Sequence, residues 1–249
     1  MRHFWRIAWA ASAQLPLANM RVLAIDTSTE ALSVALRTEQ GTAERGLETA
    51  RGHAEQILSL IDAVLGEAGV RLSQLDGIAA GVGPGSFTGV RISVAVAQGL
   101  AYGAGLPVAP VTSLEALAFP AIETGADRVI ACLDARMGEI YWGCFAADPV
   151  RGLHALGSLQ VAAASRVRLP SADRYRGVGR GFTAYPELAA LPGVEVDARS
   201  VMTLPNAADM ARLGALRLAA GEGVDPADLK PEYVRDKVAL TEAERLGSK

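Results

Sequence analysis

Cysteine and histidine are both scarce in this sequence of 249 residues. Two cysteines, Cys132 and Cys144, are too few for a disulfide framework and are not spaced as metal ligands. The three histidines, His3, His53 and His154, lie so far apart that a zinc site built from them is not expected. The scarcity argues against a disulfide-rich secreted domain and fits a protein of the reducing cytoplasm.

Long hydrophobic runs and net positive charge are also absent. No stretch reaches the ~18 consecutive apolar residues of a membrane-spanning helix, so no membrane association is expected. The formal charge of -3 offers no overall attraction for nucleic acid, so any contact with RNA should be local or through a partner. The one basic concentration indicates a solvated loop, with RNA contact as the alternative, because few aromatic residues lie nearby for base stacking. It comprises Arg166, Arg168, Arg174, Arg176 and Arg180.

Residues 1–19 combine a basic start, a short apolar stretch and an Ala-Ser-Ala sequence, as a secretory signal does. The apolar stretch is broken and weak for a signal, and a well-patterned strand begins directly after Met20. We therefore interpret residues 1–19 as a disordered extension or the product of a start codon assigned too far upstream. A signal peptide is the alternative.

Strand-like and helix-like segments alternate from Met20 onward. The hydrophobic pattern predicts strands over 21–26, 32–37, 43–50, 78–82 and 108–111, and helices over 53–66, 86–103 and 113–118. This order predicts a mixed sheet with helices packed on it.

The pattern then restarts. A strand over 129–134 repeats the first one and ends in Asp134 as the first ends in Asp26, and a hairpin arm follows over 140–145. We therefore predict two closely packed lobes of related design, an N-terminal lobe over 20–120 and a C-terminal lobe with a tail over 121–249, preceded by the extension over 1–19.

Two polar turns are candidates for a vestigial nucleotide site. An Asp-Thr-Ser sequence ends the first strand, where its amides and hydroxyls could hold a phosphate. A glycine-rich loop precedes the helix over 86–103, whose free N–H groups also suit an anion. Neither segment has a P-loop lysine or a dinucleotide-binding frame, so an ordinary turn and helix cap remain the alternative. The candidate residues are Asp26, Thr27, Ser28, Gly83, Gly85 and Ser86.

The two long helices of the first lobe carry more apolar surface than one sheet requires. In the helix over 86–103, Gly89, Ser93 and Ala97 recur every four residues as a seam of small side chains. We predict that a partner protein covers this surplus with two helices of its own, with burial inside the chain as the alternative. The predicted interface residues are Ile57, Leu58, Leu60, Ile61, Val90, Ser93, Val94, Ala97 and Ala101.

Six segments form a distinctive set that spans nearly everything after Met20. They are LAIDTSTEALSVAL at 23–36, HAEQILSLIDAVL at 53–65, GVGPGSFTGVRISVAVAQGLA at 81–101, VTSLEALA at 111–118, CLDARMGEIYWGCF at 132–145 and KPEYVRDKVA at 230–239. Together they resemble the bacterial TsaB (YeaZ) family of tRNA threonylcarbamoyladenosine biosynthesis, and the GPGSFTGVR run is highly specific. Residues 1–19 have no counterpart in the family.

The resemblance implies an α/β fold of the actin-like ATPase type, with two lobes of mixed sheets flanked by helices, related to sugar kinases and heat-shock ATPases. It implies a partner subunit that activates the catalytic paralogue TsaD, joined by the ATPase TsaE. That complex transfers threonylcarbamoyl to N6 of adenosine 37 in tRNAs that read codons starting with A. The family also implies pairing through the two helices, with TsaD or with a second copy, and indirect contact with tRNA. ATP and Mg²⁺ are then used through partners, with no cofactor of this chain's own.

Catalysis by this chain is not expected. The matching helix of TsaD carries His-x-x-x-His to hold a metal, and the corresponding positions here are Ser113 and Leu117, neither of which replaces imidazole. The sequence also has no His-Glu-x-x-His motif, so no metal ligands and no catalytic residues are predicted. The alternatives are a free-standing ATP-dependent kinase, with Asp26 or Asp134 positioning metal and phosphate, and a metallopeptidase.

Overall fold

The first lobe is built on a five-stranded mixed sheet. The computed structural model, which describes residues 17–48 and 52–235, places its strands in the order β3-β2-β1-β4-β5. β1 is antiparallel to β2 and parallel to β4, β2 is antiparallel to β3, and β4 is parallel to β5. The strands are β1 (Val22–Asp26), β2 (Ala31–Thr38), β3 (Gly41–Glu48), β4 (Gly77–Gly81) and β5 (Val108–Val111).

The second lobe repeats this plan. Read from β8, its main path β8-β7-β6-β10-β11 has the same sequence of two antiparallel and then two parallel pairings, and β9 pairs with β7 at the side. The predicted restart of the pattern is therefore confirmed at the level of topology. The strands are β6 (Arg128–Arg136), β7 (Glu139–Asp148), β8 (Gly152–Ala155), β9 (Gln160–Ala162), β10 (Tyr175–Val178) and β11 (Val194–Val196).

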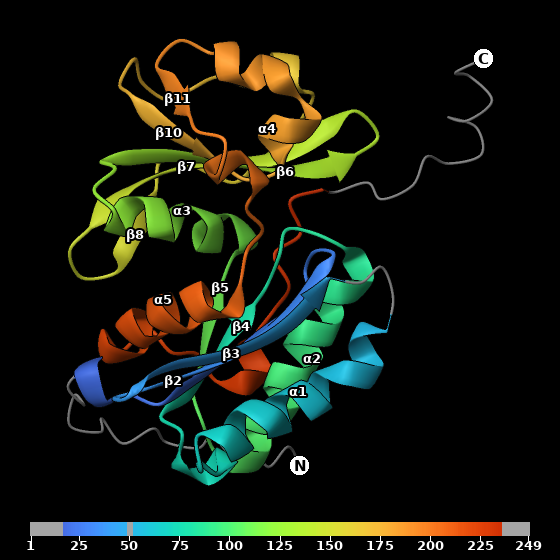
Figure 1. Ribbon diagram of the computed structural model, residues 1–249, viewed down its shortest axis with the longest axis vertical. Coiled ribbons are helices and arrows are strands. Elements are labelled where there is room, and N and C mark those ends of the chain that lie inside the picture. The colour runs from blue at the N-terminus through green and yellow to red at the C-terminus, as the bar shows by residue number, and fades with distance from the viewer. Residues whose placement is uncertain (1–16, 49–51, 236–249) are drawn as a thin grey trace, which may run out of the picture.

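The helices and sheets form alternating layers (Figure 1). α1 and α2 cover the outer face of the first sheet, α3 and α5 lie between the two sheets, and α4 lies on the far side of the second sheet. The α-helices are α1 (His53–Glu67), α2 (Phe87–Ala104), α3 (Ser113–Glu123), α4 (Gly181–Ala184) and α5 (Ala207–Ala219). Short 3-10 turns are η1 (Leu17–Asn19), η2 (Leu72–Gln74), η3 (Ala164–Arg166), η4 (Pro186–Ala190), η5 (Ser200–Met202) and η6 (Pro226–Asp228).

The alternation of side chains along β1 assigns its two faces to two different cores. Leu23 and Ile25 belong to the core beneath α1 and α2, whereas Val22 and Ala24 belong to the core that contains α3 and α5. Because both faces of the strand are buried, its sequence is a continuous apolar run. A third core fills the far side of the second sheet around Tyr175 and Phe182.

Local signals account for the helix ends. α2 begins after Ser86, whose side chain accepts a hydrogen bond from an amide of the first turn, and it ends at Gly105 in the left-handed conformation. α3 begins with a capping box formed by Thr112 and Glu115. The helix continues through Pro120 to Glu123, beyond the predicted end at residue 118, because its last turns are buried between the two lobes.

The predicted boundary between the lobes is wrong for the last part of the chain. α5 packs on β1, β2, β4 and β5 of the first lobe, and Val224 forms a bridge to Val108. The chain therefore returns to the first lobe after building the second, so α5 and the segment to Val224 do not belong to a C-terminal lobe over 121–249. Most of the predicted extension, residues 1–16, and the end of the strand predicted over 43–50 lie outside the described residues.

Candidate functional site

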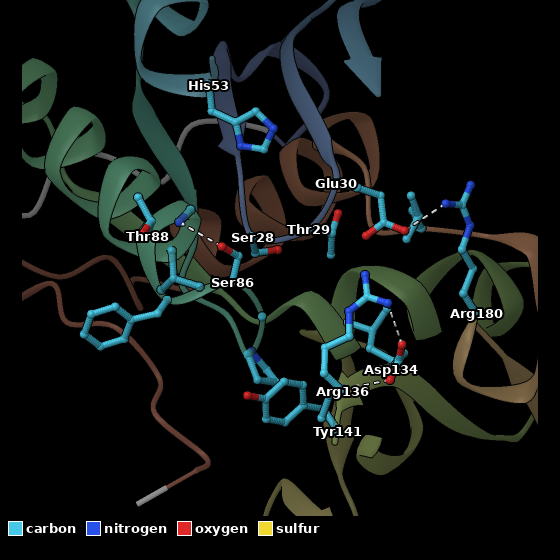
Figure 2. A pocket seen from close by; sticks show the side chains of 18 of the residues that line it. Ser28, Thr29, Glu30, His53, Ser86, Thr88, Asp134, Arg136, Tyr141 and Arg180 are labelled. Carbon is cyan, nitrogen blue, oxygen red and sulfur yellow. Dashed lines mark hydrogen bonds and ion pairs between the residues drawn. The ribbon is translucent and has the colours of Figure 1, made fainter. Parts of the chain in front are cut away.

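A cavity of about 1060 Å³ lies between the two lobes. The first lobe contributes the β1–β2 turn and the start of α2, and the second lobe contributes the β6–β7 hairpin and the segment after β10. Figure 2 shows polar side chains from both lobes facing this space, including Thr29 and Glu30 on one side and Arg136, Tyr141 and Arg180 on the other. These five residues line the cleft but were not recognised as cleft residues from the sequence.

The Asp-Thr-Ser turn lies at the wall of this cavity with its three residues buried, and Ser28 is among the residues that line the space. Asp26 accepts hydrogen bonds from the amide of Ser28 at 3.0 Å and from its hydroxyl at 3.1 Å. The hydroxyl of Thr27 donates to the carbonyl oxygen of Gly89 at 2.6 Å, and that of Ser113 donates to the hydroxyl of Ser28 at 2.8 Å. The polar groups of the turn are therefore used inside the protein.

Asp26 is a buried acid without a cationic partner in this network. Burial raises the pKa of its carboxyl from 3.8 to about 6, against the opposing effect of the hydrogen bonds from Ser28. At neutral pH the site therefore holds a desolvated negative charge, which repels a phosphate.

The glycine-rich loop covers the turn. The amide of Ser86 donates to the carbonyl oxygen of Ser28 at 2.7 Å, and a Cβ added at Gly85 would lie 2.0 Å from that same oxygen. The structure thus brings the six predicted residues of the nucleotide site together, as the sequence predicted. It also places the backbone of the glycine-rich loop directly against the carbonyl oxygen of Ser28, so the protein itself covers part of the turn.

Ser113 and Leu117, the two positions that the family resemblance sets against metal-binding histidines, are both buried. The hydroxyl of Ser113 is buried against Ser28, and Leu117 is packed in the core between the lobes. Across residues 17–48 and 52–235, no cluster of three or more His, Cys, Asp or Glu side chains is arranged to hold a metal ion.

An ionic cluster joins the lobes beside the cavity. The guanidinium group of Arg180 lies 2.9 Å from Glu30 (Figure 2) and 3.0 Å from Glu48, and both glutamates are more than a hundred positions away in the sequence. At Arg180, therefore, the predicted basic loop is paired with carboxylates of this chain. Arg174 is paired with Glu195 in a similar way, and Arg168 donates to two nearby backbone carbonyls.

The predicted small-residue seam faces this chain's own sheet, so the prediction that another subunit covers it is wrong. The hydroxyl of Ser93 donates to the carbonyl oxygen of Ile25 at 2.9 Å, and a Cβ added at Gly89 would lie 1.9 Å from the carbonyl oxygen of Thr27. The seam thus allows α2 to approach β1 closely. The predicted interface residues buried in this way are Ile57, Ile61, Val90, Ser93, Val94, Ala97 and Ala101.

A different face of the same helices is open. Leu58 on α1 is exposed and Leu60 is half-buried, while on α2 Phe87 and Tyr102 are exposed at 44% and 71%. Between these two aromatic side chains the exposed positions are small or uncharged, apart from Arg91. The sequence signal for this face was the near absence of charge around the whole helix.

Comparison with known proteins assigns the fold and the family. The model of the TsaD family, tRNA N6-adenosine threonylcarbamoyltransferase, matches residues 46–152. The tRNA threonylcarbamoyladenosine biosynthesis protein TsaB of Escherichia coli (strain K12) is 39% identical over 225 residues, covering 88% of this chain and 96% of that protein. The protein of the same name from Haemophilus influenzae is 36% identical over 232 residues, 88% of this chain and 95% of its own length.

A crystal structure from Pseudomonas aeruginosa, of an uncharacterized protein with similarity to peptidase YEAZ, agrees with a TM-score of 0.78 at 41% identity. It covers 87% of this chain and is itself covered completely, at 100%. The predicted actin-like ATPase fold, with two mixed sheets flanked by helices, is thereby confirmed. Identity of this level over almost the whole of both chains shows that the chain belongs to the TsaB (YeaZ) family, whose named members are tRNA threonylcarbamoyladenosine biosynthesis proteins.

Proposed function

We propose that this chain is the non-catalytic partner subunit of the complex that transfers threonylcarbamoyl to N6 of adenosine 37 in tRNAs reading codons that start with A. It acts by docking onto TsaD and activating it, and the ATPase TsaE completes the assembly in the cytoplasm. The single observation that carries the proposal is the outer face of α2, beside α1, which is exposed from Thr88 to Tyr102 and has Arg91 as its one charged residue.

The composition of that face is unusual for a helix in contact with water. Among the eighteen residues of α2, Arg91 alone is charged, whereas a solvated helix face is normally rich in charged and polar side chains. A Cβ added at Gly99 would meet nothing within 4 Å, so small residues leave the backbone open to close approach. An exposed apolar strip of this kind marks a protein interface.

The identity of the partner is supported by the plan of the fold. The TsaD family model matches residues 46–152, a range that contains both α1 and α2. A TsaD subunit therefore presents a related pair of helices, and two such pairs can meet face to face around an approximate two-fold axis. Pairing with a second copy of this chain would use the same face, so it competes with pairing to TsaD.

The absence of catalysis is proposed from the cleft. The Asp-Thr-Ser turn is buried beneath the glycine-rich loop, and the positions of the metal-binding histidines hold Ser113 and Leu117. ATP and Mg²⁺ are therefore used through TsaD and TsaE, with no nucleotide bound by this chain. Calorimetric titration of the isolated protein with Mg-ATP should give no binding heat, and a clear isotherm would instead support a kinase. Contact with tRNA is indirect, in line with the ion pairing of Arg174 and Arg180.

The decisive experiment uses Ala95→Glu, which places a carboxylate on the open face of α2. The variant should fold normally, yet fail to co-migrate with TsaD in size-exclusion chromatography and fail to support tRNA modification in the reconstituted system, because the charge would be buried without a partner. Val150→Glu, at an exposed apolar position of the second lobe, is the matched control and should behave as the wild type. Normal activity of Ala95→Glu would refute the proposal. Substitutions of Val94 or Ala97 are unsuitable, because both side chains lie in this chain's own core.

A further inference from the structure

The end of α2 nearest the cleft carries an aromatic and cationic cluster that the docking proposal does not use. The rings of Phe87 and Tyr233 are stacked with centroids 6.0 Å apart. The guanidinium carbon of Arg91 lies 3.6 Å from the centroid of Phe87 and 5.8 Å from that of Tyr233, and its Nε donates to the Tyr233 hydroxyl at 2.8 Å. We call these three residues the clamp.

Tyr233 belongs to a C-terminal segment that is fixed on both sides of it. The amide of Glu232 donates to the carbonyl oxygen of Val82 in the first lobe at 2.7 Å. Two residues beyond the tyrosine, Arg235 pairs with Glu139 of the second lobe at 2.6 Å. The clamp is therefore rigid although Phe87 and Tyr233 are 44% and 49% exposed. A preorganised aromatic pair loses little conformational entropy when a partner covers it.

Arg91 retains unused donors. Its Nε is satisfied by Tyr233, but among the described residues no carboxylate pairs with its two terminal nitrogens. A guanidinium group has five N–H donors, and its planar end suits a carboxylate bound by two hydrogen bonds. The free end of Arg91 is therefore suited to bind an acidic side chain of another protein.

Resting on the proposed function, we propose that the clamp is the charged end of the TsaD-docking face, where Arg91 receives a carboxylate of TsaD while Phe87 and Tyr233 pack around it. Phe87 and Arg91 continue the exposed strip of α2 that passes through Ala95, so one helix approaching that strip also reaches the clamp. Aromatic and arginine side chains of this kind dominate the affinity of protein interfaces.

A protein partner fits the clamp better than RNA does. Two cations that line the cavity beside the clamp are paired within the chain, Arg235 with Glu139 and Arg136 with Asp134, so neither is free to extend Arg91 into a track for a phosphate backbone. RNA binding normally combines stacking with several basic side chains. An acidic residue within an otherwise apolar partner surface satisfies the single cation.

The test compares the affinity of the full chain for TsaD among Tyr233→Ala, Arg91→Met and the control Val150→Ala. Tyr233→Ala and Arg91→Met should each raise Kd by about 10-fold or more, while the control stays at the wild-type value. Arg91→Met should also flatten the salt dependence of Kd, because it removes the charge and keeps much of the apolar stem. If Tyr233→Ala loosens the C-terminal segment, the salt dependence of Arg91→Met decides the question.

The outcomes distinguish a failure of the clamp inference from a failure of the proposed docking onto TsaD. If Ala95→Glu abolishes binding while both clamp variants bind as the wild type does, the docking face stands and the clamp is not part of it. If the wild-type chain does not bind TsaD, the proposed function itself fails. If the clamp variants keep their affinity for TsaD but lose a measured affinity of the isolated chain for tRNA, the clamp is an RNA contact and the inference is overturned.

Discussion

Replacing Asp26 with asparagine tests how the Asp-Thr-Ser turn is stabilised. The carboxyl is fully buried, and its pKa is raised from 3.8 to about 6, primarily by burial. That difference corresponds to roughly 3 kcal/mol of unfavourable free energy when the folded protein holds the ionised form. Because the folded pKa is the higher one, the contribution of Asp26 to stability is fully present below about pH 4 and is lost as the pH rises through about 6.

Asparagine keeps the size of the side chain and removes the charge. The free energy of unfolding of Asp26→Asn, relative to the wild type, should therefore rise by roughly 3 kcal/mol between about pH 4 and pH 7. A hydrogen bond weakened by the amide changes the free energy of unfolding by an amount that does not vary with pH. The desolvated charge is therefore reported by the pH dependence of the difference between the two proteins. Urea denaturation of both proteins across this pH range measures the difference directly.

The control is Asp134→Asn, which removes a carboxylate near the end of β6, the first strand of the second lobe. Asp134 is partly exposed and pairs with Arg136 at 3.0 Å, so the substitution reports the effect of losing a strand-end carboxylate outside the buried network. A difference between Asp26→Asn and the wild type that stays constant from pH 4 to pH 7 would show that the carboxylate is not held as a desolvated charge, and the argument would fail.

Three further predictions concern packing and ion pairs. Gly89→Ala should lower the free energy of unfolding by about 1–3 kcal/mol because its Cβ would collide with the β1–β2 turn. Gly99→Ala, in the open part of the same helix, should raise it by roughly 0.5–1 kcal/mol, and urea denaturation compares the two. Arg180→Gln should cost less than about 1 kcal/mol, since its ion pairs are partly exposed, but it should speed amide hydrogen exchange beside the cleft. Glu115→Ala should lower the free energy of unfolding, measured by thermal denaturation, by about 3 kcal/mol. It leaves Arg217 without its carboxylate partner, and the two side chains are only 15% and 14% exposed.

Hydrophobic periodicity was sufficient to predict β1 to β5 and α1 to α3, but it gave no prediction of α5. A continuous apolar run indicated β1, and a broad stripe with glycines after it indicated α1, whose observed range is His53–Glu67. The repetition of a strand ending in aspartate indicated the second lobe. Such local signals depend on neighbouring residues along the chain, so they are readable in a single sequence.

The same reasoning failed where the outcome depended on contacts distant in sequence. Nothing local to α5 shows that it returns to pack on β1, because an amphipathic helix suits either lobe. The side of α2 that faces the sheet was also undecidable, since both sides are small or apolar. Contacts between residues distant in sequence, such as that of Ser93 with the carbonyl oxygen of Ile25, 68 positions away, determine which side faces the sheet.

The two lobes differ in how the aspartate of their first strand is held beside the cleft. Each lobe begins with a strand that carries an aspartate at or beside the cleft, Asp26 at the end of β1 and Asp134 two residues before the end of β6. In the first lobe the glycine-rich loop seals the turn, and in the second Arg136 neutralises Asp134. Beside them Arg180 ties the lobes together through Glu30. Arg136 and Arg180 are thus paired with carboxylates of this chain beside the cleft, and the pairs of Arg180 hold the two lobes in one relative position, so that the outer face of α2 is presented in one orientation.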